Sequence, residues 1–155
     1  MNLKYFLTLF LIVALIILGL VLYARLKPKE TKTIKLTLKN QELTVEIANT
    51  HLSRSKGLMF RENLAEDTGM LFVFERPGKH SFWMWDTKIS LDMIWIDSNK
   101  QIVYIQPNVP PCTESIKSRC AIYTPTQNAL YVLEVNRGFV DKFNVQIGDT
   151  AHFEL

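Results

Sequence analysis

Alternation of apolar and polar residues is the clearest pattern in the chain after residue 33. Ile34, Leu36 and Leu38 alternate with polar residues, and the same period of two recurs across residues 43–47. This period places the apolar side chains on one face of a β-strand. With Asn40-Gln41 at the natural turn, the pattern predicts a β-hairpin with one buried face.

Further apolar runs, bounded by turn residues, predict more strands. A short helix is expected over residues 51–60, capped by Thr50, with Gly57 marking its end or a close backbone contact. A second short helix is expected within residues 138–145, where Phe139 and Phe143 are four apart. The pattern predicts an α+β fold, mainly antiparallel β, as an open barrel or sandwich with one or two short helices. The remaining expected strands cover residues 70–74, 81–87, 91–97, 101–106, 128–135 and 150–155.

The amino-terminal segment differs from the rest of the chain. Residues 5–24 contain no charged side chain, and as a helix they would span about 30 Å, the thickness of a bilayer's hydrocarbon core. The run exceeds the apolar core of a typical cleaved signal peptide. We therefore expect residues 1–25 to form one N-terminal transmembrane helix, as an anchor or an uncleaved signal. A charged tether over residues 26–33 and one β-rich domain over residues 34–155 would follow.

The net positive charge belongs to this amino-terminal segment. Residues 1–29 hold Lys4, Arg25, Lys27 and Lys29 and no acid, which leaves 14 of the 18 basic residues against 15 acidic ones in the remainder. A domain with this balance has no basic face for phosphates, so nucleic acid is not an expected partner.

Two features disagree about the compartment. The cations that follow the apolar run favour a cytoplasmic domain by the positive-inside rule. Cys112 and Cys120, the only cysteines, lie in a polar, proline-led stretch; a disulfide between them would contribute roughly 2.5 kcal/mol and would persist only in an oxidising compartment. We favour an extracytoplasmic domain on a single-pass membrane anchor, with two free cytosolic thiols as the alternative.

The stretch HSFWMWDTKISLD, residues 80–92, combines aromatic rings with carboxylates. Asp92 enters an apolar row from its end, where it needs a cation, hydrogen-bond donors or water. If TKIS closes a hairpin, Asp86 and Asp92 approach each other, as in an acid/base pair. The alternative is structural: Asp86 caps the turn, and Asp92 pairs with Arg61.

Glu134 also ends an apolar row, because it shares a strand face with Leu130 and Val132. An edge glutamate is usually solvated, so a functional role competes with a plain surface role. The three histidines lack metal-ligand spacing, and no phosphate-binding glycine loop or nucleophile elbow is present. We therefore expect no metal site and no cofactor.

Six short blocks stand in order along the chain: GLMFR (57–61), GMLFVF (69–74), FWMWDT (82–87), LDMIWID (91–97), VLEVNRG (132–138) and IGD (147–149). They resemble the signature blocks of domain-of-unknown-function family 192, also known as uncharacterised protein family 0127. The resemblance covers about residues 34–155 and implies a small β-rich fold with no established activity. Here Asp86 stands where relatives mostly have Asn, which weakens a two-carboxylate mechanism and favours recognition by hydrogen bonds. Ser90 likewise replaces a proline.

Three classes of function remain open. The favoured one is an extracytoplasmic domain that binds a small polar ligand, such as a sugar, on aromatic faces flanked by carboxylates. The second is a cell-envelope module that binds another protein. The third is a hydrolase that uses Asp92 with Glu134 or Asp86; an enzyme is disfavoured, and no catalytic residue is assigned. The candidate ligand-binding residues are Arg61, Trp83, Asp86, Thr87, Asp92 and Glu134.

Overall fold

The computed structural model describes residues 3–26 and 31–155, which divide into two compact units, residues 1–30 and residues 31–155. In the first unit, residues Leu3–Leu26 form one α-helix, α1. Across the described part of the chain, no helix has both the length and the apolar character needed for a membrane crossing. The transmembrane helix expected over residues 5–24 is therefore not found, although a helix covers this range. Half of the tether expected over residues 26–33, namely residues 27–30, lies outside the described residues.

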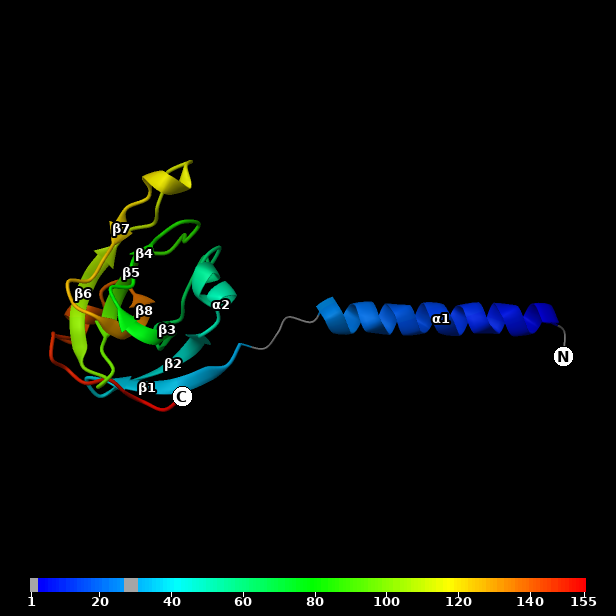
Figure 1. Cartoon of the computed structure of the whole chain (residues 1–155), viewed down its shortest axis with the longest axis horizontal. Coiled ribbons are helices and arrows are strands. Elements are labelled where there is room, and N and C mark those ends of the chain that lie inside the picture. The colour runs from blue at the N-terminus through cyan, green and yellow to red at the C-terminus, as the bar shows by residue number, and fades with distance from the viewer. Residues whose placement is uncertain (1–2, 27–30) are drawn as a thin grey trace. The chain divides into compact units, whose positions relative to one another are not determined.

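The second unit is mainly β, with one curled mixed sheet and few helices, which is an α+β fold. Seven strands lie in the order β6-β5-β8-β3-β2-β1-β9, and β4 and β7 form a separate pair. Figure 1 shows the strands of this unit curving around rather than lying in one flat layer. The elements are β1 (Thr33–Leu38), β2 (Gln41–Ala48), α2 (His51–Lys56), β3 (Thr68–Gly78), β4 (Phe82–Trp83), β5 (Leu91–Ile96), β6 (Ile102–Val109), the 3-10 turn η1 (Lys117–Arg119), β7 (Ile122–Tyr123), β8 (Ala129–Asn136), α3 (Phe139–Lys142) and β9 (His152–Phe153).

The amino-terminal strands form the hairpin that the alternating pattern predicts. β1 and β2 pair antiparallel from Thr33↔Glu46 to Leu38↔Gln41. The turn lies one residue earlier than expected, because Lys39 and Asn40 occupy it with φ of 50° and 62°. Two consecutive positive φ values are typical of a tight hairpin turn that matches the twist of its strands.

The sequence pattern predicts a mainly antiparallel sheet, but one pair of neighbouring strands is parallel. β2 and β3 run parallel, in register from Thr44↔Thr68 to Ala48↔Phe72. Parallel neighbours need a crossover connection, and residues 49–67, which include α2, provide it. Thr50 caps this helix through a reciprocal pair of hydrogen bonds with Ser53, and the helix ends at Gly57, where φ is 47°.

The two faces of the sheet carry two separate apolar clusters. On β3, β5 and β8, alternate residues such as Leu71, Ile94 and Leu133 join the cluster that includes α3. Their neighbours Phe72, Trp95 and Val132 join a second cluster that includes Leu58, just after α2. This period-two division places each buried polar residue of β5 and β8 on one particular face.

The segment 81–87 is not the long strand that we expected. Only Phe82 and Trp83 are extended, and they pair with β7 rather than β5. A turn follows at once, in which the Thr87 N–H donates to the Met84 carbonyl at 3.1 Å and Asp86 has a φ of 53°. The expected hairpin between Asp86 and Asp92 is therefore wrong, because β4 pairs with β7 whereas β5 pairs with β6 and β8.

Candidate functional site

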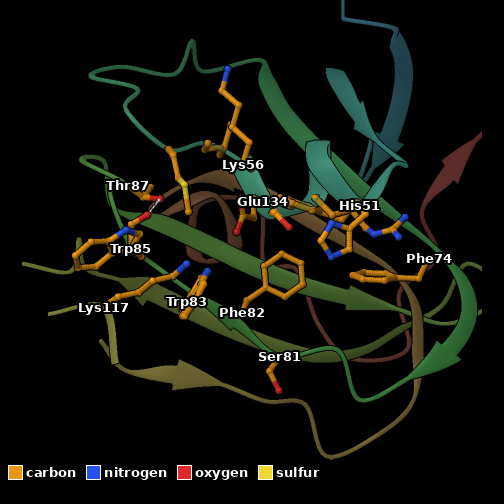
Figure 2. Close-up of a pocket in the computed structure, with 16 residues that line it drawn as sticks. His51, Lys56, Phe74, Ser81, Phe82, Trp83, Trp85, Thr87, Lys117 and Glu134 are labelled. Carbon is orange, nitrogen blue, oxygen red and sulfur yellow. Dashed lines mark hydrogen bonds between the residues drawn. The ribbon is translucent and has the colours of Figure 1, made fainter. Parts of the chain in front are cut away.

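A cavity of about 300 Å³ opens on the sheet face that carries the second apolar cluster. Its lining comes from α2 and the residues after it, from β3, β4 and β8, and from η1. Figure 2 shows the labelled side chains of these elements around one central space, with Glu134 and Phe82 near the middle. The volume falls at the small end of the range for ligand pockets.

Glu134 is the one acidic residue in this lining. It lies on β8, where its cross-strand neighbours are Met70 of β3 and Met93 of β5, and only 4% of it is exposed. Burial raises the pKa of its carboxyl to about 8, and no cation or hydrogen-bond donor of the described residues offsets that effect. At pH 7 the group is therefore mostly the neutral acid, able both to donate and to accept a hydrogen bond.

The Glu134 carboxyl opens to the cavity. In the described part of the chain, no side-chain oxygen or nitrogen is both sealed from solvent and unpartnered. Glu134 has no hydrogen-bond donor or cation beside it, so its oxygens must reach the open space. Figure 2 shows them facing the interior of the pocket.

Aromatic rings form one wall of the cavity. Phe82 meets Phe72 edge to face, with centroids 4.8 Å apart, and it packs in the same way against Phe74 and Trp95 at 6.3 and 5.8 Å. The Trp95 indole N–H donates to the His80 carbonyl at 2.8 Å, which fixes this ring in the sheet. Edge-to-face pairs favour one arrangement of rings, so the wall has a defined shape.

The turn after β4 brings Trp83, Trp85 and Thr87 to the same cavity. Thr87 is buried, and its hydroxyl contacts the Trp85 carbonyl at 3.4 Å, the interaction drawn as a dashed line in Figure 2. Trp83 is 37% exposed at the edge. The short strand and the turn together, rather than strand alternation, orient these side chains inward.

Three cationic residues, Arg54, Lys56 and Lys117, are part of the cavity lining. Lys56 is the last residue of α2, and Lys117 begins η1 with its amino group 4.3 Å from the centre of the Trp83 ring. Arg54 donates to the backbone carbonyls of Asn49 and Val73, each at 2.9 Å. None of these three cations belongs to the ion pairs found among the described residues.

A disulfide holds the segment that carries Lys117. Cys112 and Cys120 are bonded, with Cα atoms 5.6 Å apart, which confirms the predicted pair. Cys120 is buried, and β7, which follows it, pairs with β4. The bond therefore closes a small loop whose cation lies against the aromatic wall.

The family model DUF192, described as "Uncharacterized ACR", matches residues 33–153, which include every element of the cavity. The chain belongs to this family. This agrees with the resemblance of the six sequence blocks, although the description names no activity.

DUF192 relatives include proteins of archaea and structures from bacteria. A UPF0127 protein of Thermococcus gammatolerans is 28% identical over 111 residues, 72% of this chain and 67% of that protein. One of Pyrococcus furiosus is 25% identical over 120 residues, 72% of this chain and 89% of that protein. This chain thus spans about two thirds of the Thermococcus protein.

Two solved structures have the fold of this DUF192 domain. A Sinorhizobium meliloti protein, described as a candidate transcription regulator, is 33% identical with a TM-score of 0.74; 81% of this chain and 97% of that chain align. A protein of unknown function from Novosphingobium aromaticivorans is 27% identical with a TM-score of 0.68; 82% of this chain and 88% of that chain align.

Within the DUF192 domain, Asp92 serves the fold rather than the cavity. It is fully buried, and its two oxygens accept hydrogen bonds from the backbone N–H groups of Asn108 and Val140, both at 2.8 Å. The second donor lies in the first turn of α3, whose N-cap is Gly138. Because Asp92 pairs in register with Val135, it lies on the face opposite Glu134.

Arg61 and Asp86 also lie away from the cavity lining. The Arg61 guanidinium pairs with both oxygens of Glu46, each at 2.6 Å, so its partner is not Asp92 as expected. Asp86 is exposed at the turn, where its positive φ suits Asp or Asn. Of the six candidate residues, the cavity brings together Trp83, Thr87 and Glu134 and leaves out Arg61, Asp86 and Asp92.

Sequence reasoning missed the cations and part of the aromatic wall. Lys56 falls within the helix expected over residues 51–60, and Phe72 within the strand expected over residues 70–74, but neither had an assigned role. Lys117 had none either. The disulfide was the one available signal for Lys117, because it ties that loop to a fixed place, but the sequence does not say which surface the loop meets.

Proposed function

We propose that this DUF192 domain binds a small polar ligand, such as a sugar, in the cavity above Glu134, in an oxidising compartment outside the cytoplasm. The observation that carries the proposal is a buried carboxyl with no protein partner that opens to an aromatic-walled space. A ligand hydroxyl would supply the missing hydrogen bond.

The size and lining of the cavity support a ligand built on one sugar ring. A volume of about 300 Å³ lies at the small end of the range for ligand pockets, which favours a single ring over an oligosaccharide. The faces of Trp83 and Trp85 suit the apolar C–H face of a sugar ring. Glu134 and Thr87 provide hydrogen-bonding groups for its hydroxyls.

The geometry disfavours the hydrolase alternative. Asp92 and Glu134 lie on opposite faces of the sheet, and both Asp92 oxygens are occupied by backbone donors. Asp86 is exposed outside the lining. Among the residues that the structure describes, no second carboxylate therefore lies beside Glu134 for the paired acid and base that the mechanism needs.

The compartment part of the proposal rests on the Cys112–Cys120 disulfide, because such bonds are rare in the cytosol. Thiol labelling of intact and permeabilised cells, with and without reductant, tests it. We expect labelling only after reduction. Labelling from the cytoplasmic side without reductant would contradict the placement.

Binding is tested by titrating D-glucose into the full-length chain and following tryptophan fluorescence and thermal unfolding. Saturation at a hundredfold excess over Kd should add about 2.7 kcal/mol of stability. Trp83→Ser should abolish both signals, whereas Phe60→Asn should retain them. Phe60 is an exposed aromatic outside this cavity, 62% accessible, and its φ of 66° suits Asn. Equal responses of the two variants would contradict binding in this cavity.

A further inference from the structure

The charges around the cavity do not balance. Arg54, Lys56 and Lys117 line it together with a single acid, Glu134. Exposed lysines are common on any surface, but these two come from separate elements, α2 and η1. In Figure 2 the amino group of Lys117 points toward the central space, whereas that of Lys56 points away from Glu134. The cavity therefore has positive charge at its edge and a neutral, aromatic interior.

The protein itself leaves this positive charge uncompensated. Lys35, Lys88 and Lys142, elsewhere on the surface, each pair with a glutamate. Among the described residues, no such pair includes Lys56 or Lys117. Lys117 instead lies over the Trp83 ring, 4.3 Å from its centre, on the loop closed by the disulfide. A loop held in this way keeps its ammonium group at the cavity edge.

The protonation state of Glu134 decides whether the cavity favours an anionic or a cationic ligand. Its pKa of about 8 makes the neutral form about tenfold more abundant than the carboxylate at pH 7. A neutral acid donates a hydrogen bond to an anion or a hydroxyl without repelling it. An amine would first have to ionise this carboxyl, and it would also face the positive charge at the edge of the cavity.

We propose that the ligand of this cavity is an acidic sugar or sugar phosphate, a polyhydroxylated ring whose anionic group lies beside Lys117 at the edge of the cavity while a ring oxygen or hydroxyl accepts a hydrogen bond from Glu134. This rests on the proposed function and narrows it to one charge class. Charge-assisted hydrogen bonds are about twice as strong as neutral ones, so the anion adds both affinity and selectivity.

The test compares D-glucuronate, D-glucose 6-phosphate, D-glucose and D-glucosamine on the full-length chain at pH 7, by titration calorimetry. We expect at least one of the two acidic sugars to bind roughly tenfold or more tightly than D-glucose, the gain expected of one charged hydrogen bond. Which acidic sugar prevails separates a carboxylate source from a phosphate source. The advantage should shrink in high salt.

Matched variants locate the charge. The double variant Lys56→Gln, Lys117→Gln should lose the preference for the acidic sugar while still binding D-glucose. Lys88→Gln is the control, because Lys88 is exposed, pairs with Glu62 and is absent from the lining. It should keep the preference. An unchanged preference in the double variant would overturn the inference.

Glu134 gives an independent readout. Glu134→Gln keeps a neutral donor, so binding of the acidic sugar at pH 7 should persist, and the loss of affinity expected in wild type above about pH 8 should disappear. The neighbours of Glu134 on β3 and β5, Met70 and Met93, do not titrate. The other charged or titratable lining groups are Arg54, Lys56, Lys117 and His51, so the pH series is repeated in His51→Asn.

The outcomes separate the two proposals. If D-glucose binds as tightly as both acidic sugars, the charge inference fails and the proposed function stands. If D-glucosamine binds most tightly and Glu134→Gln abolishes its binding, the charge inference is reversed and the proposed function stands. If none of the four sugars binds, both fail.

Discussion

Glu134 makes the stability of this domain depend on pH in a direction opposite to that of most acids. The carboxyl has a pKa of about 8 in the folded protein because of burial, against the ordinary value of 4.5. The native state therefore holds a proton that the unfolded state has released between these two pH values. Stability falls with rising pH wherever the native state binds more protons.

The magnitude follows from the size of the shift. At about 1.36 kcal/mol per pKa unit, raising the pKa from 4.5 to about 8 corresponds to about 5 kcal/mol in the free energy of unfolding. This contribution is fully present below about pH 4.5 and is lost as the pH rises through about 8. Glu134→Gln removes this dependence on pH, because a glutamine does not titrate.

The assay is urea unfolding of wild type and Glu134→Gln at a series of pH values from 4.5 to 9. The difference in unfolding free energy, variant minus wild type, should rise by about 5 kcal/mol across this window. Taking the difference cancels the histidines and the other acids. Glu62→Gln is the control. Glu62 is fully exposed, and hydrogen bonding to Lys88 lowers its pKa from 4.5, so it is ionised across this window. The unfolding free energy of this variant, minus that of wild type, should therefore stay nearly constant with pH. A flat difference for Glu134→Gln as well would refute the assignment of Glu134 as a buried neutral acid.

Three further changes test structural features of the domain, each by urea unfolding. Asp92→Asn should cost about 2–5 kcal/mol, because one backbone N–H of Asn108 or Val140 would face an amide donor; a loss below 1 kcal/mol would contradict its capping role. Gly69→Ala should cost about 1–3 kcal/mol, since a Cβ there would lie 2.6 Å from the Glu134 carbonyl oxygen, whereas Gly78→Ala, whose Cβ meets only the His80 side chain at 3.3 Å, should cost less. Replacing both disulfide cysteines by serine should remove roughly 2.5 kcal/mol; unchanged stability would show that the loop is equally ordered without the bond.

Local patterns were sufficient where one periodicity or one cap determines the structure. The β1–β2 hairpin, the helix capped by Thr50 and the disulfide could all be predicted from residues close in the sequence. The parallel pairing of β2 with β3 could not, because alternation gives the buried face of a strand and not the direction of its neighbour.

Sequence alternation predicts on which side of its own strand a side chain lies, but not what covers that side. Glu134 was placed correctly at the end of an apolar row, but its burial depends on Met70 and Met93 of neighbouring strands. Asp92 had the same local signature, and the two differ only in which face they occupy. For Arg61, the partner Glu46 lies in a strand fifteen residues away, a distance at which sequence pattern gives no pairing.

The crossover that the parallel pair requires has a consequence for the evolution of this domain. Residues 49–67 join β2 to β3, and α2 within them lines one side of the cavity without belonging to the sheet. Under the proposed function, replacements on α2 would change ligand selectivity while the backbone hydrogen bonds of the sheet stay intact. Sequence divergence among family members in this one connection would then give different ligand selectivities on the same fold.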